Sequence, residues 1–224
     1  MSGKNKQKLP DEIIVIPNAD KEFHEVVDQN NLANMPHPNR ICYIANPNSG
    51  KTLAIKNVLL RSVPPYERIV VYHADPTSEE YNDIDVEYVS EIPEVEFWDR
   101  TKKNLFILED INFRRLKADQ KQLVDRYYGS FSTHHSISVW STFQRAFSCP
   151  PEIRDYCNIL FLWNTRNVNS LSALSSRLGI DADDLKYIFK NICKDKYDFL
   201  VIDSTRPEKY LRKNIFTVID YKNV

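Results

Sequence analysis

The sequence predicts an α/β fold, in which helices cover both faces of a mostly parallel, twisted sheet. Short apolar runs rich in β-branched residues alternate with amphipathic segments along most of the chain. Continuous apolar strands of this kind are typical of parallel sheets that are buried on both faces. The chain has 224 residues, of which 42% are hydrophobic, so one domain with a sizeable core is expected.

The predicted elements follow one another regularly after residue 39. Strands are predicted over residues 40–45, 68–73, 104–110, 137–143, 158–163, 198–203 and 214–220. Helices are predicted over residues 51–61, 117–131, 169–178 and 181–193. A short connection that contains Pro207 separates the last two strands, so we expect them to be antiparallel and to lie at the C-terminal edge of the sheet.

The N-terminal part is expected to differ from the rest of the chain. Residues 1–35 are predicted to form a tail and a connector, and residues 36–224 to form the domain. Residues 1–12 are polar and basic, which indicates a flexible tail. Residues 13–17, IIVIP, are a candidate edge strand, and residues 19–39 combine a short helical pattern with a connector rich in proline and asparagine.

Charge and cysteine content exclude several classes of protein. The net charge is −1, so no overall field attracts nucleic acid or a membrane, and any DNA contact has to come from a local patch. Cys42, Cys149, Cys157 and Cys193 form no CxxC pair, which indicates free thiols in a reducing compartment and a protein that is not secreted. No apolar run approaches about 18 residues, so no membrane span is predicted.

Residues 45–52, ANPNSGKT, have the pattern of a phosphate-binding loop between a strand and a helix. Gly50 lets the backbone approach the phosphates, and successive backbone N–H groups form an anion nest at the start of the helix. Lys51 reaches the β and γ phosphates, and the Thr52 hydroxyl is expected to bind Mg²⁺. The residues expected to bind ATP are Asn46, Pro47, Asn48, Ser49, Gly50, Lys51, Thr52 and Leu53.

The loop has one glycine where such loops often have several. Asn46 and Asn48 tolerate left-handed backbone better than most residues, so we expect them to replace some of the missing glycine. Pro47 removes one N–H group but pre-sets a turn angle. A strand–turn–helix with an accidental Gly-Lys-Thr is the alternative interpretation.

An apolar strand that ends in acid is the second part of such a site, because its carboxylates hold Mg²⁺ and activate water. Glu109 and Asp110 directly follow an apolar run, residues 105–108. We expect Glu109 to help hold Mg²⁺ through a water molecule and Asp110 to activate the attacking water. Glu109 is one methylene longer than the aspartate usual at its position. A solvated strand end is the alternative for both acids.

Gln144 follows the next predicted strand, residues 137–143. A glutamine at the carboxyl end of a parallel strand beside the acidic strand can reach the γ-phosphate or its attacking water. We therefore expect Gln144 to act as a sensor of the γ-phosphate. A polar loop residue without such a role is the alternative.

The order of these motifs resembles that of the genome-packaging ATPases of large DNA viruses, including the poxvirus type, and of tailless phages, within the FtsK–HerA superfamily. The segments that carry the resemblance are RICYIANPNSGKT, RIVVYHADPTSEEY, LFILEDI, HHSISVWSTFQ and PPEIRDYCNILFLW, and together with the C-terminal strands they cover about residues 36–220. The resemblance implies an additional-strand P-loop NTPase core. It also implies an ATP- and Mg²⁺-dependent motor that moves double-stranded DNA into a preformed capsid.

The same resemblance implies partners and a location. It implies a ring of subunits, a pentamer or a hexamer, which contacts double-stranded DNA and a capsid vertex or portal-like protein. It also implies a protein that resides in the host cytoplasm of an infected cell or on the virion.

The sequence departs from the family pattern just before the sensor strand. Many members carry an Arg-His pair there, whose arginine is a candidate catalytic finger for the neighbouring subunit, whereas this chain has Thr133 and His134. A finger therefore has to come from elsewhere, and the candidates are Arg126, Arg145 and Arg154. Arg145 follows the sensor directly, and Arg154 matches the family's Ile-Arg segment. A surface salt bridge is the alternative for each.

A basic cluster follows the acidic motif and consists of Arg114, Arg115, Lys117, Lys121 and Arg126. In a ring this region could face the pore and touch DNA phosphates in a salt-sensitive manner, while a solvated helix face is the alternative. Residues 4–8, KNKQK, could also contact DNA or capsid. His134 and His135 are adjacent and lack a nearby third ligand, so a metal site is not predicted there.

Two other functions remain open from the sequence. A small P-loop nucleotide kinase would need an acceptor pocket and an arginine-rich lid, and the chain has no clear lid segment. A nucleotide-binding capsid or assembly factor would bind nucleotide with negligible turnover.

Overall fold

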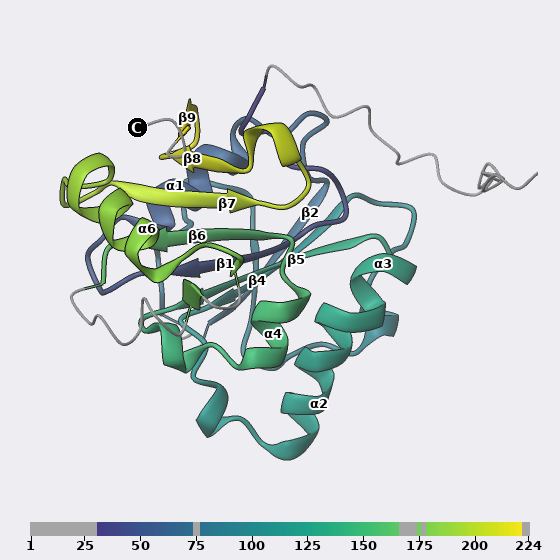
Figure 1. Cartoon of the computed structure of the whole chain (residues 1–224). Helices are drawn as coiled ribbons and strands as arrows, with labels where there is room; N and C mark the ends of the chain where they lie inside the picture. The colour runs from purple at the N-terminus through teal and green to yellow at the C-terminus, as the bar shows by residue number, and fades with distance from the viewer. Residues whose placement is uncertain (1–30, 74–76, 166–173, 176–177, 221–224) are drawn as a thin grey trace, which may run out of the picture.

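One nine-stranded sheet forms the centre of the computed structural model, which describes residues 31–73, 77–165, 174–175 and 178–220 (Figure 1). Its order is β3-β2-β4-β5-β1-β6-β7-β8-β9. The strands are β1 (Arg40–Ile44), β2 (Arg68–His73), β3 (Glu87–Val89), β4 (Asn104–Glu109), β5 (Ile137–Phe143), β6 (Ile159–Trp163), β7 (Phe199–Asp203), β8 (Leu211–Lys213) and β9 (Thr217–Val218).

The strand order confirms the predicted additional-strand arrangement. β5 lies between β1 and β4 and pairs in parallel with both, so a strand separates the loop-bearing strand from the acidic strand. β1 also pairs in parallel with β6, and β2 with β3 and β4. The pairs from β6 to β9 are antiparallel, as expected for the C-terminal edge.

Helices cover both faces of the sheet, as predicted. The α-helices are α1 (Lys51–Leu59), α2 (Ala118–Arg126), α3 (Ser132–His134), α4 (Pro151–Tyr156) and α6 (Ala182–Tyr187). The shorter helical turns are η1 (Val95–Phe97), η2 (Phe113–Arg115), η3 (Tyr127–Phe131), η4 (Ala146–Ser148), η5 (Ile188–Ile192) and η6 (Pro207–Lys209). The predicted helix 117–131 is thus α2 continued by η3, and 181–193 is α6 continued by η5, whereas most of 169–178 lies outside the described residues.

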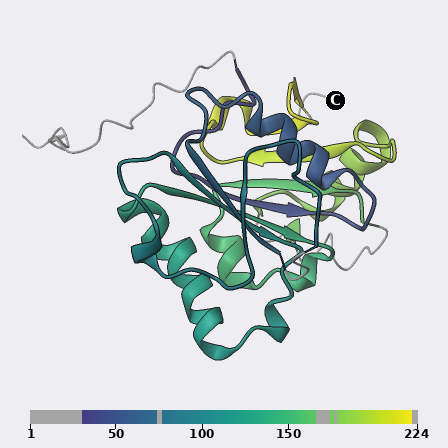
Figure 2. The same cartoon turned by 180° about the vertical axis from the view of Figure 1, so that it is seen from behind.

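The two sides of the sheet have separate hydrophobic cores. On one side, Ala54, Ile55 and Val58 of α1 pack against alternate residues of the central strands, such as Tyr43 and Trp140. On the opposite side, α2, α4 and α6 pack against the residues in between. Figures 1 and 2 show this division, with α1 on one side and α2, α3 and α4 below on the other. Because both sides are covered, the central strands read as continuous apolar runs.

The predicted last strand, residues 214–220, is wrong in its bounds. Asn214 has a φ of +53°, so the chain turns there instead of continuing in extended form. The turn separates β8 from β9, and the strand therefore begins earlier, at Leu211. The short edge strand β3 was not predicted, because its three residues have no apolar pattern.

Residues just before β1 belong to the packed structure. Ala33 and Met35 are buried in the core beside α1. The Asn39 side chain is fully buried, and its Oδ1 accepts a hydrogen bond from the Trp140 indole. The predicted tail and the candidate strand 13–17 lie outside the described residues. No helix in the described part of the chain is long and apolar enough to cross a membrane.

Candidate nucleotide-binding site

The predicted phosphate loop connects β1 to α1 at the carboxyl end of the sheet's central strand (Figure 1). Gly50 has a φ of +88° and precedes the first residue of α1, and Asn48 has a φ of +58°. Asn48 therefore takes a left-handed turn position, as expected, whereas Asn46 is not among the residues with positive φ. No side chain caps the start of α1, so its first N–H groups remain available to an anion.

Lys51 extends from the loop toward the acidic strand. Its side chain is largely buried, and its Nζ lies 3.5 Å from the carbonyl oxygen of Ala45 and 3.7 Å from Oδ1 of Asp110. The Thr52 hydroxyl donates a hydrogen bond of 3.1 Å to Oε2 of Glu80. Lys51 thus already bridges the loop and the acidic motif across the inserted strand.

The two acids at the end of β4 have different environments. Glu109 is buried, and its carboxylate accepts hydrogen bonds from the Tyr81 hydroxyl (2.7 Å) and the Thr142 hydroxyl (3.1 Å). Asp110 leaves the strand with a φ of +43°, and its side chain is partly exposed. The sharp turn between them directs one carboxylate into the protein and the other toward Lys51.

Burial changes the acid strength of Glu109. The pKa of this carboxyl is raised to about 7, chiefly by the loss of water contact on burial and also by the nearby carboxylates of Glu80 and Asp110. The hydrogen bonds from Tyr81 and Thr142 oppose that rise in pKa. A cation placed beside Glu109 would lower the pKa again, because it favours the charged form.

Gln144 lies next to Asp110, as the parallel pairing of β4 and β5 requires. Its Nε2 donates a hydrogen bond of 2.9 Å to Oδ2 of Asp110. From the same strand, Oγ1 of Thr142 accepts a hydrogen bond of 2.6 Å from the Asp110 backbone N–H. The structure therefore brings Lys51, Asp110 and Gln144 together at the ends of β1, β4 and β5.

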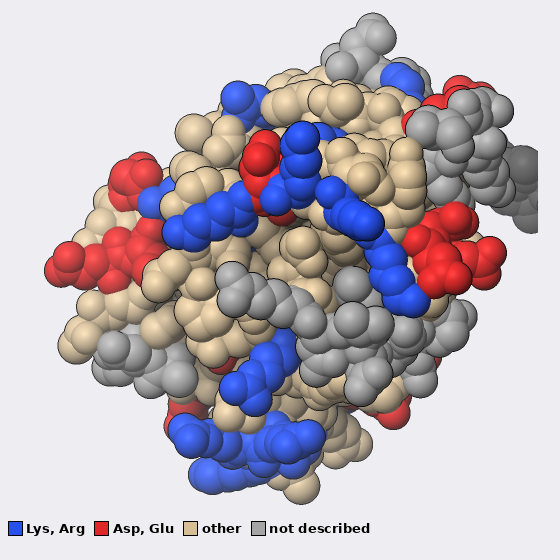
Figure 3. All heavy atoms as spheres, turned by 60° about the vertical axis from the view of Figure 1, so that its left-hand side comes forward, with Lys and Arg blue, Asp and Glu red and all other residues tan. Residues whose placement is uncertain are grey.

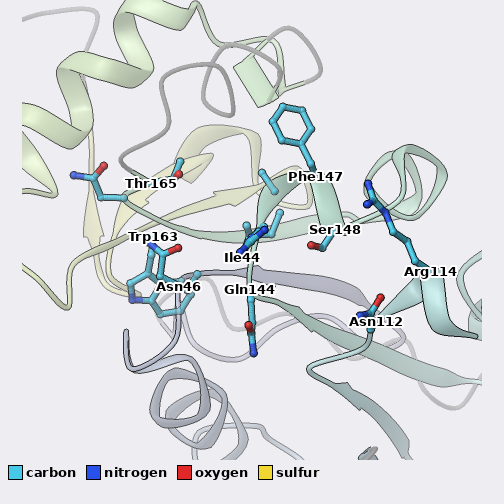
Figure 4. A pocket seen from close by; sticks show the side chains of 13 residues that line it. Ile44, Asn46, Asn112, Arg114, Gln144, Phe147, Ser148, Trp163 and Thr165 are labelled. Atoms are coloured by element: carbon cyan, nitrogen blue, oxygen red, sulfur yellow. The ribbon is translucent and has the colours of Figure 1, made fainter.

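A cavity of about 770 Å³ opens beside these residues, at the carboxyl ends of β1, β5 and β6. Figure 4 shows Asn46 and Trp163 on one side of it, Asn112 and Arg114 on the other, and Gln144 between them. The Arg145 side chain also lines the cavity and has no hydrogen-bond or ion-pair partner among the residues that the structure describes. The cavity thus joins the predicted sensor to two cationic side chains.

The other two candidate arginines have partners in their own subunit. Arg154 on α4 donates a hydrogen bond of 2.9 Å to the carbonyl oxygen of Ala146, which fixes the turn after β5. The guanidinium of Arg126 lies 4.3 Å from the centre of the Phe131 ring, in a cation–π contact. Neither of these two residues lines the cavity that contains Gln144.

Three residues at the site were not identified from the sequence. Glu80 and Tyr81 follow β2, and they reach Thr52 and Glu109 only because β2 pairs with β4. Thr142 precedes the sensor by two residues on β5 and contacts both acids. The pairing of strands brings these side chains into the site, and this pairing cannot be predicted from the spacing of the motifs.

The residues present fit a Mg²⁺-bound nucleoside triphosphate. The left-handed backbone at Gly50, the uncapped start of α1 and the Lys51 ammonium are groups of the kind that bind phosphates in proteins. Thr52 and the nearby carboxylates provide oxygen ligands, which Mg²⁺ prefers. Within the described residues, no three His, Cys, Asp or Glu side chains form a metal cage. Such a site suits an ion that is held largely by phosphate oxygens and water.

Comparisons with known proteins identify the fold. No protein-family model and no curated protein matches this sequence. The DNA-packaging ATPase B204 of Sulfolobus turreted icosahedral virus superposes with a TM-score of 0.60 at 16% identity, over 80% of this chain and 98% of that chain. B204 of Sulfolobus turreted icosahedral virus 2, a genome-packaging NTPase in complex with AMPPCP, superposes with a TM-score of 0.58 at 15% identity, over 79% of this chain and 96% of that chain.

A third similar structure is that of a conjugation protein rather than a viral one. TcpA, the conjugation coupling protein of pCW3, in its monomer form with ATPγS, gives a TM-score of 0.54 at 11% identity, over 91% of this chain and 70% of that chain. At these identities the similarity concerns the fold. The chain therefore has the α/β P-loop NTPase fold that these nucleotide-binding proteins share.

Proposed function

We propose that the protein is an ATPase that moves double-stranded DNA into a viral capsid. The observation that carries this proposal is the meeting of Lys51, Asp110 and Gln144 at the ends of three adjacent strands, with Lys51 3.7 Å and Gln144 2.9 Å from the Asp110 carboxylate. The fold shared with viral packaging NTPases supports it, and in this chain the sensor strand lies between the loop strand and the acidic strand, as the resemblance to that family implies.

Each side chain at the site has a distinct role in this proposal. Lys51 and the loop N–H groups bind the β and γ phosphates, and Thr52 binds Mg²⁺. Asp110 accepts the proton of the attacking water, and Gln144 orients that water against the γ-phosphate. Bound Mg²⁺-ATP would supply the transferable phosphoryl group and neutralise part of its charge.

Glu109 has a positioning role in the proposal. It is buried and held by Tyr81 and Thr142, so it is poorly placed to take a proton from a water molecule in the open cavity. A carboxylate with restrained oxygens is well suited to hold a Mg²⁺-bound water. This division supports Asp110 rather than Glu109 as the general base.

We assign the catalytic finger to Arg145, ahead of Arg154 and Arg126. Arg145 directly follows Gln144 and lines the same cavity, while the guanidinium groups of Arg154 and Arg126 are engaged within the subunit. In the proposed ring, Arg145 of one subunit would act on the γ-phosphate bound by its neighbour, because its side chain has no partner among the described residues of its own subunit. Such an arginine contributes about 10³–10⁵ in rate in well-studied NTPases.

The basic cluster is the proposed contact with DNA. Arg114, Arg115 and Lys117 are exposed and come directly after the acidic motif, in η2 and at the start of α2. Figure 3 shows Lys and Arg side chains gathered at the lower end of the molecule, where Figure 1 places α2. Arg114 also lines the cavity that contains Gln144, so the proposed DNA contact and the catalytic site share a segment.

ATP turnover with and without double-stranded DNA tests the proposal. The wild type should hydrolyse ATP faster with DNA, and Lys51→Ala should lower the rate at least about a hundredfold. Lys56→Ala is the matched control, because Lys56 lies on the same helix but pairs with Asp83. Equal rates for wild type and Lys51→Ala would refute the motor, and so would phosphate transfer to a nucleoside or binding without turnover.

A mixing experiment tests the role of Arg145. Arg145→Ala and Lys51→Ala subunits should each be inactive alone. Mixed in one ring, they should recover part of the activity, because an intact loop then meets an intact Arg145 from its neighbour. Arg154→Ala serves as the comparison and should not be complemented in the same way. No recovery in the Arg145 mixture would exclude an action between subunits.

A further inference from the structure

A second, more apolar cavity lies beside the phosphate loop, on the side away from Gln144. It has a volume of about 460 Å³, which is within the range of small-ligand pockets. Its walls come from the loop and α1 on one side, and from the segments before β7 and after β8 on the other. Figure 2 shows α1 lying over the C-terminal strands, so the fold itself creates this cavity.

Three large apolar side chains face this cavity and are exposed to solvent. The exposed fractions are 65% for Leu53, 61% for Tyr197 and 53% for Phe216. Each aromatic ring has a cation nearby, with Lys196 at 4.8 Å from the Tyr197 ring and Arg61 at 5.5 Å from the Phe216 ring. Exposed apolar side chains gathered around one cavity indicate a binding surface rather than scattered surface residues.

The cavity is continuous with the phosphate loop. Ser49 and Gly50 form part of its wall, and a Cβ placed on Gly50 would lie 3.7 Å from the Tyr197 ring. Leu53, which directly follows the proposed Mg²⁺ ligand Thr52, forms another part. A ligand whose phosphates occupy the loop therefore has its remaining portion within reach of this cavity.

The side-chain amides that line the cavity already have partners. Asn57 donates to the Leu53 carbonyl oxygen and accepts from Arg61. Asn214 donates to Asp198 and accepts from the Phe199 backbone N–H. These bonds fix the orientation of both amides in the cavity wall, and the largest surfaces that face a flat ring are the side chains of Leu53, Tyr197 and Phe216.

We propose that this cavity holds the nucleobase of the bound nucleotide, by stacking on Tyr197 and Phe216 and by contact with Leu53. The inference rests on the proposed function, because the phosphate loop has to hold the rest of the same molecule. Since stacking surfaces accept any base, the site binds purine nucleoside triphosphates without strong discrimination between adenine and guanine.

Affinity measurements with two probes test this assignment. The affinities of ATP, GTP and inorganic tripolyphosphate are measured by calorimetry for the wild type, Tyr197→Ala and Phe216→Ala. Loss of a stacking ring should weaken ATP and GTP binding about tenfold or more, while tripolyphosphate affinity stays within about twofold. Tyr187→Ala is the matched control, because Tyr187 is also exposed but does not line the cavity.

The possible outcomes separate the two proposals. If Tyr197→Ala and Phe216→Ala bind ATP as tightly as the wild type, the base lies elsewhere, although hydrolysis could still proceed. An equal loss of ATP and tripolyphosphate affinity would mean that the substitutions disturb the loop, which overturns the stacking assignment. A preference for ATP over GTP above about a hundredfold would overturn the lack of base discrimination. Specific ATP binding without turnover would instead refute only the motor function.

Discussion

Replacement of Glu109 by glutamine is expected to stabilise the protein in the absence of Mg²⁺ and nucleotide. Burial raises the pKa of this carboxyl from 4.5 to about 7, so the folded protein holds its proton more tightly than the unfolded chain does. Between those two pH values the folded state binds more protons, and its stability therefore falls as the pH rises. Above pH 7, the cost of the buried charge is about 3 kcal/mol, at about 1.4 kcal/mol per pKa unit.

Glutamine removes this cost and can keep both hydrogen bonds. Its carbonyl oxygen can accept from the Tyr81 hydroxyl, as Glu109 Oε2 does at 2.7 Å. Its amide can donate to the Thr142 hydroxyl, which can then donate to Asp110 Oδ1, 3.4 Å away. Glu109→Gln should therefore be more stable than the wild type by about 1 kcal/mol at pH 5 and by about 3 kcal/mol at pH 8.

Urea unfolding from pH 5 to pH 8 in a buffer with EDTA measures this difference, with the emission of the buried tryptophans as the signal. At pH 8 the unfolding midpoint should rise by about 1 M or more, since the slope is about 1–3 kcal/mol per M. Asp110→Asn is the control and should show no comparable gain, because Asp110 is partly exposed. A difference in the free energy of unfolding between Glu109→Gln and wild type that does not change with pH would refute the reasoning.

Three further predictions concern stability. Burial lowers the pKa of His37 to about 4, so the free energy of unfolding falls as the pH drops below 6.5. In urea unfolding, the stability of His37→Asn relative to the wild type should therefore increase by about 2 kcal/mol between pH 7 and pH 5. Asp203→Asn should lower the free energy of unfolding by about 3–5 kcal/mol in the same measurement, because it leaves the fully buried Arg212 without its ion pair. Asp203→Asn combined with Arg212→Met should lower it less. A loss in the double variant equal to the sum of the two single losses would contradict this. Gly50→Ala should lose about 1–2 kcal/mol and weaken nucleotide binding, because its φ is +88°, whereas helical Gly129→Ala should show no loss in thermal unfolding.

The sequence predicted the local turn positions of the site and the meeting of two motifs at the ends of neighbouring parallel strands. The turn positions of Asn48 and Gly50, and the convergence of Asp110 with Gln144, follow from local backbone chemistry and from the parallel order of strands. Contacts made by side chains outside these motifs could not be predicted in this way. Tyr81 reaches Glu109 because β2 is the neighbour of β4, and hydrophobic periodicity does not encode which strands are neighbours.

The predicted final strand failed for a related reason. A run of apolar and β-branched residues, 214–220, suggested one strand, but a left-handed residue at its start turned the chain. Asparagine adopts the left-handed conformation more readily than most residues, but the sequence around an asparagine does not predict whether it does so. The bounds of elements are therefore less predictable from sequence than their existence.

The strand between β1 and β4 has a consequence for which ligands the protein can tell apart. Neighbouring strands lie about 4.8 Å apart, so the loop strand and the acidic strand are separated by about 10 Å. In the structure the long arm of Lys51 spans this interval to reach Asp110. A polyphosphate held on the loop has to span it too, and a diphosphate is shorter than a triphosphate by one phosphoryl group. The width of a single strand therefore determines which side chains a bound polyphosphate contacts, according to its length.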